Sequence, residues 1–273
     1  MAKCDYCPLL EPDAKGEAMD DGLAFLREIE AKAEVLADVV APIFGDSPKT
    51  YVHAAGFGSG FIASRGTTFF FITADHVVDD FSKFKVAVAN IAGRSFDLSL
   101  LRFSRNESRD CAVATLPHQL LAPTDFKHYE LDWDWSNWTS TGVFVAIGYP
   151  STRNELKPGF GKADRNEVRV FATPSNERPR KTKLIDYFAL SYDPENIKRS
   201  DGSPVELPDL HGMSGGPCLE IMRSPTAEYS FKFAGVVSEF HPAEKALLIA
   251  IVDAAQYVDA TSLIPQHTPP PRQ

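Results

Sequence analysis

The sequence predicts a mainly antiparallel β protein. After residues 45–48, short apolar runs rich in Val, Ile, Phe and Thr alternate with Gly, Asn, Asp and Pro, a pattern typical of strands and turns. Little helix separates these runs, so the strands are expected to pair as barrels or as a sandwich. The chain has 273 residues, which allows one large domain or two small ones with a real core.

Composition limits the classes of partner. Hydrophobic residues make up 44% of the chain and charged residues 24%, as in ordinary soluble proteins. The formal net charge of −9 argues against non-specific nucleic-acid binding, which depends on neutralising phosphates. The sequence lacks an apolar window long enough for a membrane helix, and residues 1–21 lack the pattern of a signal peptide. No nucleic-acid or membrane partner is expected.

The four cysteines do not form a disulfide framework. Cys111 and Cys218 lie in apolar runs and are expected to be buried. Cys4 and Cys7 have the spacing of a metal knuckle, but no second pair completes a four-ligand site, and a disordered terminus over residues 1–19 is favoured. The sequence therefore predicts neither metal nor cofactor, and a reducing, cytoplasmic location.

A helix is expected over residues 20–45, with Asp20 and Asp21 as N-terminal caps. Apolar residues recur there at steps of three and four: Leu23, Leu26, Ile29, Ala33, Leu36 and Val40. The favoured interpretation is a helix packed on the outside of the main domain. The alternative is a helix that binds a regulatory partner or a second copy.

About a dozen strands are expected in a domain over residues 46–260, in two groups at about 46–120 and 142–252. They lie near residues 50–54, 57–63, 68–73, 84–90, 96–103, 111–116, 143–148, 167–173, 184–190, 216–221, 231–238 and 246–252. A helical turn is expected after His76, and a helical stretch near 253–259. The proline-rich tail, residues 261–273, is expected to be disordered.

Two segments between strands are open to two interpretations each. The connection 117–141 contains Trp133, Trp135 and Trp138, which either pin this long loop to the body or form a ligand platform. Residues 174–183 are locally basic and are interpreted as a solvated loop, with binding of an acidic partner as the alternative.

Three residues have the types needed for nucleophilic catalysis. Ser214 lies in a glycine-rich turn, and a serine needs an adjacent base and an acid that orients the base. His76 follows the apolar run 68–73. Asp110 opens the apolar run 111–116, where a buried carboxylate requires a partner.

Three motifs that contain these residues follow a glycine-rich motif along the chain. The four are Gly58-Ser59-Gly60-Phe61, Thr73-Ala74-Asp75-His76-Val77, Asp110-Cys111-Ala112-Val113 and Gly212-Met213-Ser214-Gly215-Gly216-Pro217. Over about residues 50–255 the chain resembles the chymotrypsin/trypsin-like serine peptidases, in the form found inside bacteria. Subtilisin-like enzymes and α/β-hydrolases have their triad residues in other orders.

The resemblance implies two six-stranded antiparallel barrels with an active site between them. It implies a serine endopeptidase that cleaves protein or peptide substrates through an acyl-enzyme. His76 would act as general base and then acid, Asp110 would orient it, and Ser214 would be the nucleophile. The backbone N–H groups of Gly212 and Ser214 would form the oxyanion hole.

The resemblance also assigns substrate-binding positions. The backbone of Ser238, Glu239 and Phe240 would pair with the substrate as an added strand. Pro208 would lie at the base of the primary pocket, or Asp209 after a slip of one residue. Asp209 in the pocket would favour Lys or Arg, whereas the bulk of Phe240 favours a small or apolar residue, the preferred prediction.

Departures from the family's pattern bear on regulation. Met213 stands where many secreted relatives have an aspartate that pairs with a newly cut N-terminus, and Val77 replaces a disulfide cysteine. Activation by terminus insertion is therefore not expected. Two other functions stay open: a catalytically silent module that binds protein partners, and an esterase with the same triad. Asp75 is expected to point to solvent, and Asp79 and Asp80 to belong to the helical turn.

Overall fold

A computed structural model describes residues 17–46, 54–84, 86–91, 94–117, 127–151, 166–176, 179, 181–192 and 209–252. Several sequence predictions lie outside these residues. They are the Cys4 and Cys7 pair, most of the strand near 50–54, the helical stretch near 253–259, the tail 261–273, Arg178 and Arg180 of the basic loop, and Pro208.

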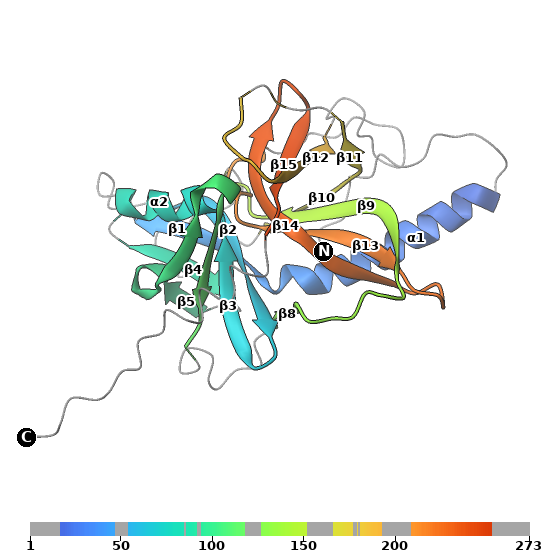
Figure 1. The fold of residues 1–273 in the computed structure, drawn as a ribbon, viewed down its shortest axis with the longest axis horizontal. Helices are drawn as coiled ribbons and strands as arrows, with labels where there is room; N and C mark the ends of the chain where they lie inside the picture. Colours follow the sequence, from blue (N-terminus) through green and yellow to red (C-terminus); the bar gives the residue numbers. More distant parts are fainter. Residues whose placement is uncertain are drawn as a thin grey trace, which may run out of the picture.

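The first sheet has eight strands and curls into a half-barrel (Figure 1). Its main path runs through β5 (Arg94–Asp97), β4 (Ala87–Ile91), β1 (Val40–Asp46), β2 (Ala54–Arg65), β3 (Thr68–Thr73), β7 (Cys111–Thr115) and β6 (Phe103–Asn106). All neighbours in this path are antiparallel. The short strand β8 (Tyr129–Glu130) pairs with β2 in parallel.

The second sheet has seven antiparallel strands and also curls into a half-barrel. Its order is β10 (Val168–Ala172), β9 (Thr139–Gly148), β13 (Pro217–Arg223), β14 (Tyr229–His241), β15 (Ala246–Ala250), β12 (Tyr187–Ser191) and β11 (Pro174–Ser175). The first sheet takes in β1 from the predicted helix and β8 from the predicted connection, and the two sheets lie beside each other in Figure 1.

The prediction of two closed six-stranded barrels is wrong. In the described residues the ends of the first path, β5 and β6, do not pair, and the second sheet ends at β10 and β11. The expected strand near 96–103 is replaced by β5, a 3-10 helix η2 (Leu98–Leu100) and β6. The expected strand near 167–173 is β10, which ends at Ala172, and β11 begins separately at Pro174.

The N-terminal helix is shorter at its C-terminal end than predicted. Helix α1 spans Glu17–Ala37. Residues 17–19, expected to be disordered, are helical, and most of residues 38–45, expected to be helical, belong to β1. The apolar run continued the helical spacing past Ala37, but Pro42 cannot lie inside a helix without removing a hydrogen bond. In β1, Pro42 lies opposite Ser59, next to a bulge at Ile43.

Helix α1 packs on the body as the favoured interpretation predicted. Ile29 and Ala33 are fully buried, the ring of Phe25 meets Tyr229 on β14 edge to face at 4.8 Å, and Lys32 Nζ donates to the Tyr229 carbonyl at 2.6 Å. In Figure 1 the blue helix runs alongside the second sheet. Within the described residues, no helix is both long and apolar enough to cross a membrane.

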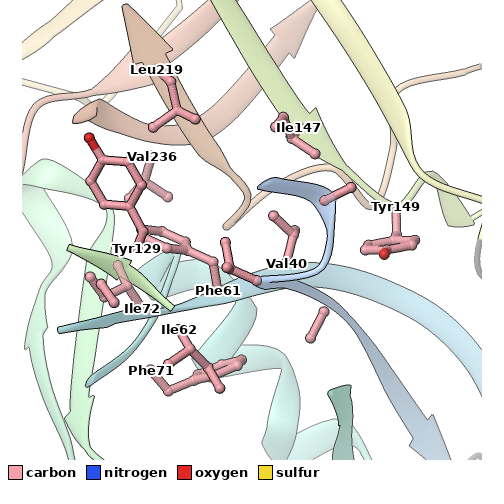
Figure 2. Packing of buried hydrophobic residues seen from close by; sticks show 14 of the residues in the cluster. Val40, Phe61, Ile62, Phe71, Ile72, Tyr129, Ile147, Tyr149, Leu219 and Val236 are labelled. Atoms are coloured by element: carbon pink, nitrogen blue, oxygen red, sulfur yellow. The ribbon is translucent and has the colours of Figure 1, made fainter. Parts of the chain in front are cut away.

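One hydrophobic cluster joins both sheets and the helix (Figure 2). Phe61 and Ile72 come from the first sheet, and Ile147, Leu219 and Val236 from the second. Tyr129 adds a polar link, because its hydroxyl donates to the Phe231 carbonyl at 2.6 Å and accepts from the Phe233 N–H at 2.8 Å. Because the halves share a core, groups placed between them are held rigidly.

The three tryptophans of the connection 117–141 lie together, in an arrangement that fits both a loop pinned to the body and a ligand platform. The rings of Trp133 and Trp135 are 6.2 Å apart, and those of Trp135 and Trp138 are 5.4 Å apart. Trp133 is 52% exposed, whereas the other two are partly buried. The cluster therefore packs partly within its own loop and presents one ring to solvent.

Candidate active site

His76 lies where the first sheet ends and a short helix begins. Strand β3 ends at Thr73, and the helix α2 (Asp75–Asp80) carries His76 as its second residue, whereas the sequence predicted a helical turn only after His76. Asp79 and Asp80 belong to this helix, as predicted. The preceding Ala74 has an extended backbone and gives α2 no side-chain cap.

Asp110 is brought to the same place by a tight turn. The 3-10 helix η3 (Glu107–Arg109) ends there, and Asp110 has a left-handed backbone with φ of 45° before β7 begins. Asp is among the few residues that tolerate this conformation. The residue is only 7% exposed, so its carboxylate needs partners.

The carboxylate of Asp110 holds His76 at two atoms. The ring Nδ1 lies 3.0 Å from Oδ1 and 2.8 Å from Oδ2, and the backbone N–H of His76 donates to Oδ1 at 2.9 Å. This arrangement fixes the ring with Nδ1–H toward Asp110, so Nε2 is left as the basic nitrogen.

The electrostatic surroundings favour the charged form of His76. Burial of the ring acts against the charged form, but the hydrogen bond to Asp110 and the negative charges of Asp110, Asp80 and Glu239 outweigh it. The pKa of His76 is therefore raised above its ordinary value. Such a histidine accepts a proton more readily than one in water.

Glycines allow the turn that carries Ser214 to fit between the halves. Gly215 has φ of +91°, and a Cβ there would lie 2.0 Å from the Ser59 carbonyl oxygen and 2.3 Å from Thr73 Oγ1. A Cβ at Gly216 would lie 2.0 Å from the Ile147 carbonyl oxygen. The serine-bearing turn thus lies directly against the strand ends of both sheets.

Ser59 is a buried link between the turn and both sheets. Its N–H donates to the Ser214 carbonyl at 2.7 Å, and its hydroxyl donates to the Gly212 carbonyl at 2.8 Å while accepting from the Tyr149 N–H at 2.9 Å. Thr73 Oγ1 in turn donates to the Ser59 carbonyl at 2.7 Å. These bonds fix the backbone of the turn relative to the strand before His76.

Ser238 connects Ser214 with Asp110. Its hydroxyl donates to Asp110 Oδ2, and its carbonyl accepts the hydroxyl of Ser214 at 2.9 Å. The pairing of β14 with β15 shifts register between Val237 and Glu239, and such a bulge re-aims the residue within it. His76, Asp110 and Ser238 thus form one hydrogen-bonded chain that ends at Ser214.

The backbone N–H groups of Gly212 and Ser214 are available as donors. Among the described residues, neither donates to a protein acceptor. Gly212 has φ of +94°, and a Cβ there would lie 2.6 Å from the Ser151 nitrogen. The positive φ turns this peptide in a way that only glycine adopts readily.

The predicted substrate-binding residues have partners of their own. Glu239 accepts from Thr182 Oγ1 at 3.2 Å and pairs with His241 Nε2 at 2.6 Å. The ring of Phe240 meets Tyr192 edge to face at 5.4 Å. The Tyr192 contact holds the Phe240 ring against the second half.

Asp209 pairs with its neighbour His211, whose ring nitrogen and backbone N–H both hydrogen-bond to it. The hydrogen bond from the His211 side chain is the main cause that lowers the pKa of Asp209, and its carboxylate is about half exposed. The negative charge of Asp209 is thus already hydrogen-bonded at the surface.

The prediction that Asp75 points to solvent is wrong. Asp75 is 2% exposed, and its two carboxylate oxygens accept from Nε and Nη2 of Arg105 at 2.7 and 2.9 Å. Sequence spacing gave no sign of this pair, since Arg105 lies 30 positions away on β6. A signal was present in the acid itself, which follows an apolar strand as Asp110 precedes one.

The side-chain roles of Ser59 and Ser238 were not predicted from the sequence. Ser59 was noted only as part of a glycine-rich motif, and Ser238 only for its backbone.

Cys111 and Cys218 are buried as predicted, and burial raises the pKa of both thiols. In the described part of the chain, no group of three or more His, Cys, Asp or Glu side chains is arranged to hold a metal ion.

No protein-family model matches this chain, and no curated protein sequence is similar to it.

Proposed function

We propose that the protein is a serine endopeptidase of the chymotrypsin/trypsin-like class, with His76, Asp110 and Ser214 as its catalytic residues. The observation that carries the proposal is the double attachment of His76 to Asp110, which leaves Nε2 as the base. Ser214 is connected to the same aspartate through Ser238. Two half-barrels with the site between them support the class.

In the proposed reaction, the Ser214 hydroxyl turns from the Ser238 carbonyl toward His76 Nε2 and attacks the substrate carbonyl. The proton moves to Nε2, and Asp110 stabilises the imidazolium. The N–H groups of Gly212 and Ser214 stabilise the oxyanion. The imidazolium then protonates the leaving amine, and water hydrolyses the acyl-enzyme through the same groups.

The surroundings of the site support a preference for small or apolar side chains. The Phe240 ring is packed on Tyr192 beside the strand expected to pair with substrate. The Asp209 carboxylate is hydrogen-bonded to His211, which weakens the alternative of a Lys or Arg preference. Met213 is fully buried against Gly148, which supports a site that needs no inserted N-terminus.

The alternative is a peptidase-fold module that binds protein partners without catalysis. The observation that favours it is the hydroxyl of Ser214, which donates to the Ser238 carbonyl in this state. An esterase with the same triad is a further possibility, and turnover of an ester beside the matching peptide separates it from a peptidase.

Labelling with a fluorophosphonate probe tests the proposal. We expect wild type to be labelled at Ser214 and the labelling to disappear in Ser214→Ala. Ser82→Ala is the matched control, because Ser82 is an exposed serine just after the helix of His76. No labelling of folded wild type, with or without candidate partners, would favour the silent module.

A further inference from the structure

Arg105 on β6 bonds to two aspartates of α2, the helix that carries His76. Its Nε and Nη2 donate to the two oxygens of Asp75 at 2.7 and 2.9 Å, and Nη2 also pairs with Asp79. The Asp75 side chain is 3% exposed, whereas that of Arg105 is 41% exposed. The contact is therefore a bidentate ion pair with one buried partner, a geometry that lysine cannot reproduce.

Helix α2 is held by Val77, which is fully buried in the core, by the bonds from His76 to Asp110, and by this contact with Arg105. It has six residues and no side-chain N-cap, and helices this short are unstable alone. Asp75 precedes His76 directly, and Asp79 lies one turn later. Arg105 thus attaches both turns of α2 to the first sheet.

The same stretch of chain carries Arg105 and Asp110. Asn106 Oδ1 caps η3 by accepting from the Arg109 N–H at 3.1 Å, and the Asp110 N–H donates to the Glu107 carbonyl at 3.2 Å. Residues 105–110 are therefore a short, internally bonded segment. Its first residue holds Asp75 and its last holds His76.

We propose that Arg105 is a positioning residue for His76: through Asp75 it sets the place of α2 relative to Asp110, so that the ring and backbone nitrogens of His76 both reach the carboxylate. The consequence for reaction rate rests on the proposed peptidase function. The consequence for the hydrogen bond between His76 and Asp110 does not.

Charge and position predict opposite effects of removing Arg105. The negative groups that act on His76 are Asp110, Asp80 and Glu239. If Arg105 acted only as a nearby cation, its removal would favour the imidazolium and raise the pKa of His76. If it acts by position, the hydrogen bond to Asp110 loosens and the pKa falls toward about 6.5.

The experiment is an NMR titration of the His76 ring, with the signal assigned from its loss in His76→Gln. We compare wild type with Arg105→Met, Arg105→Lys and a control, Arg65→Met. Arg65 lies on β2 of the same sheet and forms one exposed bond to Asp132, at 3.1 Å. We expect the pKa of His76 to fall in both Arg105 variants and to stay unchanged in Arg65→Met.

The rate of fluorophosphonate labelling is measured on the same samples. We expect a loss of about 10²-fold in Arg105→Met, the scale of a misplaced catalytic group, and no loss in Arg65→Met. A raised or unchanged pKa of His76 in Arg105→Met overturns the proposal. If that variant does not fold, an unchanged pKa in Arg105→Lys overturns it equally.

The two proposals fail separately. If wild type is not labelled, the peptidase proposal fails, yet the titration of His76 still decides the role of Arg105. If wild type is labelled and the titration shows no fall, the peptidase proposal stands and the positioning role is lost.

Discussion

The substitution Gly215→Ala tests how closely the serine-bearing turn lies between the halves. Gly215 has φ of +91°, and an alanine Cβ there would lie 2.0 Å from the Ser59 carbonyl oxygen, 2.3 Å from Thr73 Oγ1 and 3.0 Å from the Ala74 nitrogen. Two of these atoms are backbone. The Cβ would also break the hydrogen bond from Thr73 to the Ser59 carbonyl.

The expected loss of unfolding free energy in Gly215→Ala has two contributions. A non-glycine residue with positive φ costs about 1–2 kcal/mol, and overpacking adds about 1–3 kcal/mol or more. We expect the free energy of unfolding to fall by about 2–5 kcal/mol, from a total that is typically about 5–15 kcal/mol. Urea denaturation at constant pH measures this change.

Gly142→Ala is the matched control. Gly142 also has a positive φ, +72°, but no atom lies within 4 Å of the Cβ position. It should lose only the backbone term, about 1–2 kcal/mol. If Gly215→Ala loses no more than Gly142→Ala, the turn is not packed between the strand ends and the description of the site is wrong.

Three further predictions concern the base, the acid and the N-terminal helix. The pKa of His76 is raised, and the base acts only when it is neutral. The rate of Ser214 labelling should therefore fall as the pH decreases, with a midpoint above about pH 6.5. A midpoint below that pH in a rate–pH profile would contradict this. Asp110→Asn should lower kcat by about 10⁴-fold, and kinetics showing less than a tenfold loss would remove Asp110 from the triad. Ile29→Ala, in the buried face of α1, should lose about 2–5 kcal/mol of unfolding free energy, whereas Val35→Ala, 57% exposed, should change it by less than about 0.5 kcal/mol.

Local sequence patterns predicted the elements that carry the site. The run before His76 became β3, and the run after Asp110 became β7. These patterns depend on alternation and on turn residues, which act over a few positions. The position of His76 and Asp110 at strand ends could therefore be predicted before their contact was known.

Contacts between distant segments could not be predicted in the same way. Two such contacts are the bond between Arg105 and Asp75 and the bond between Ser238 and Asp110. They join segments far apart in the sequence, so local spacing does not predict them. The end of α1 was misplaced because the apolar spacing continued into β1, although Pro42 marked the change.

Cleavage of a defined peptide library, with wild type and Ser214→Ala measured side by side, tests the proposed peptidase activity. We expect wild type to cleave internal peptide bonds, preferentially after small or apolar residues, and Ser214→Ala to leave every peptide intact. Folded wild type that cleaves no peptide, or Ser214→Ala that cleaves as wild type does, would contradict it.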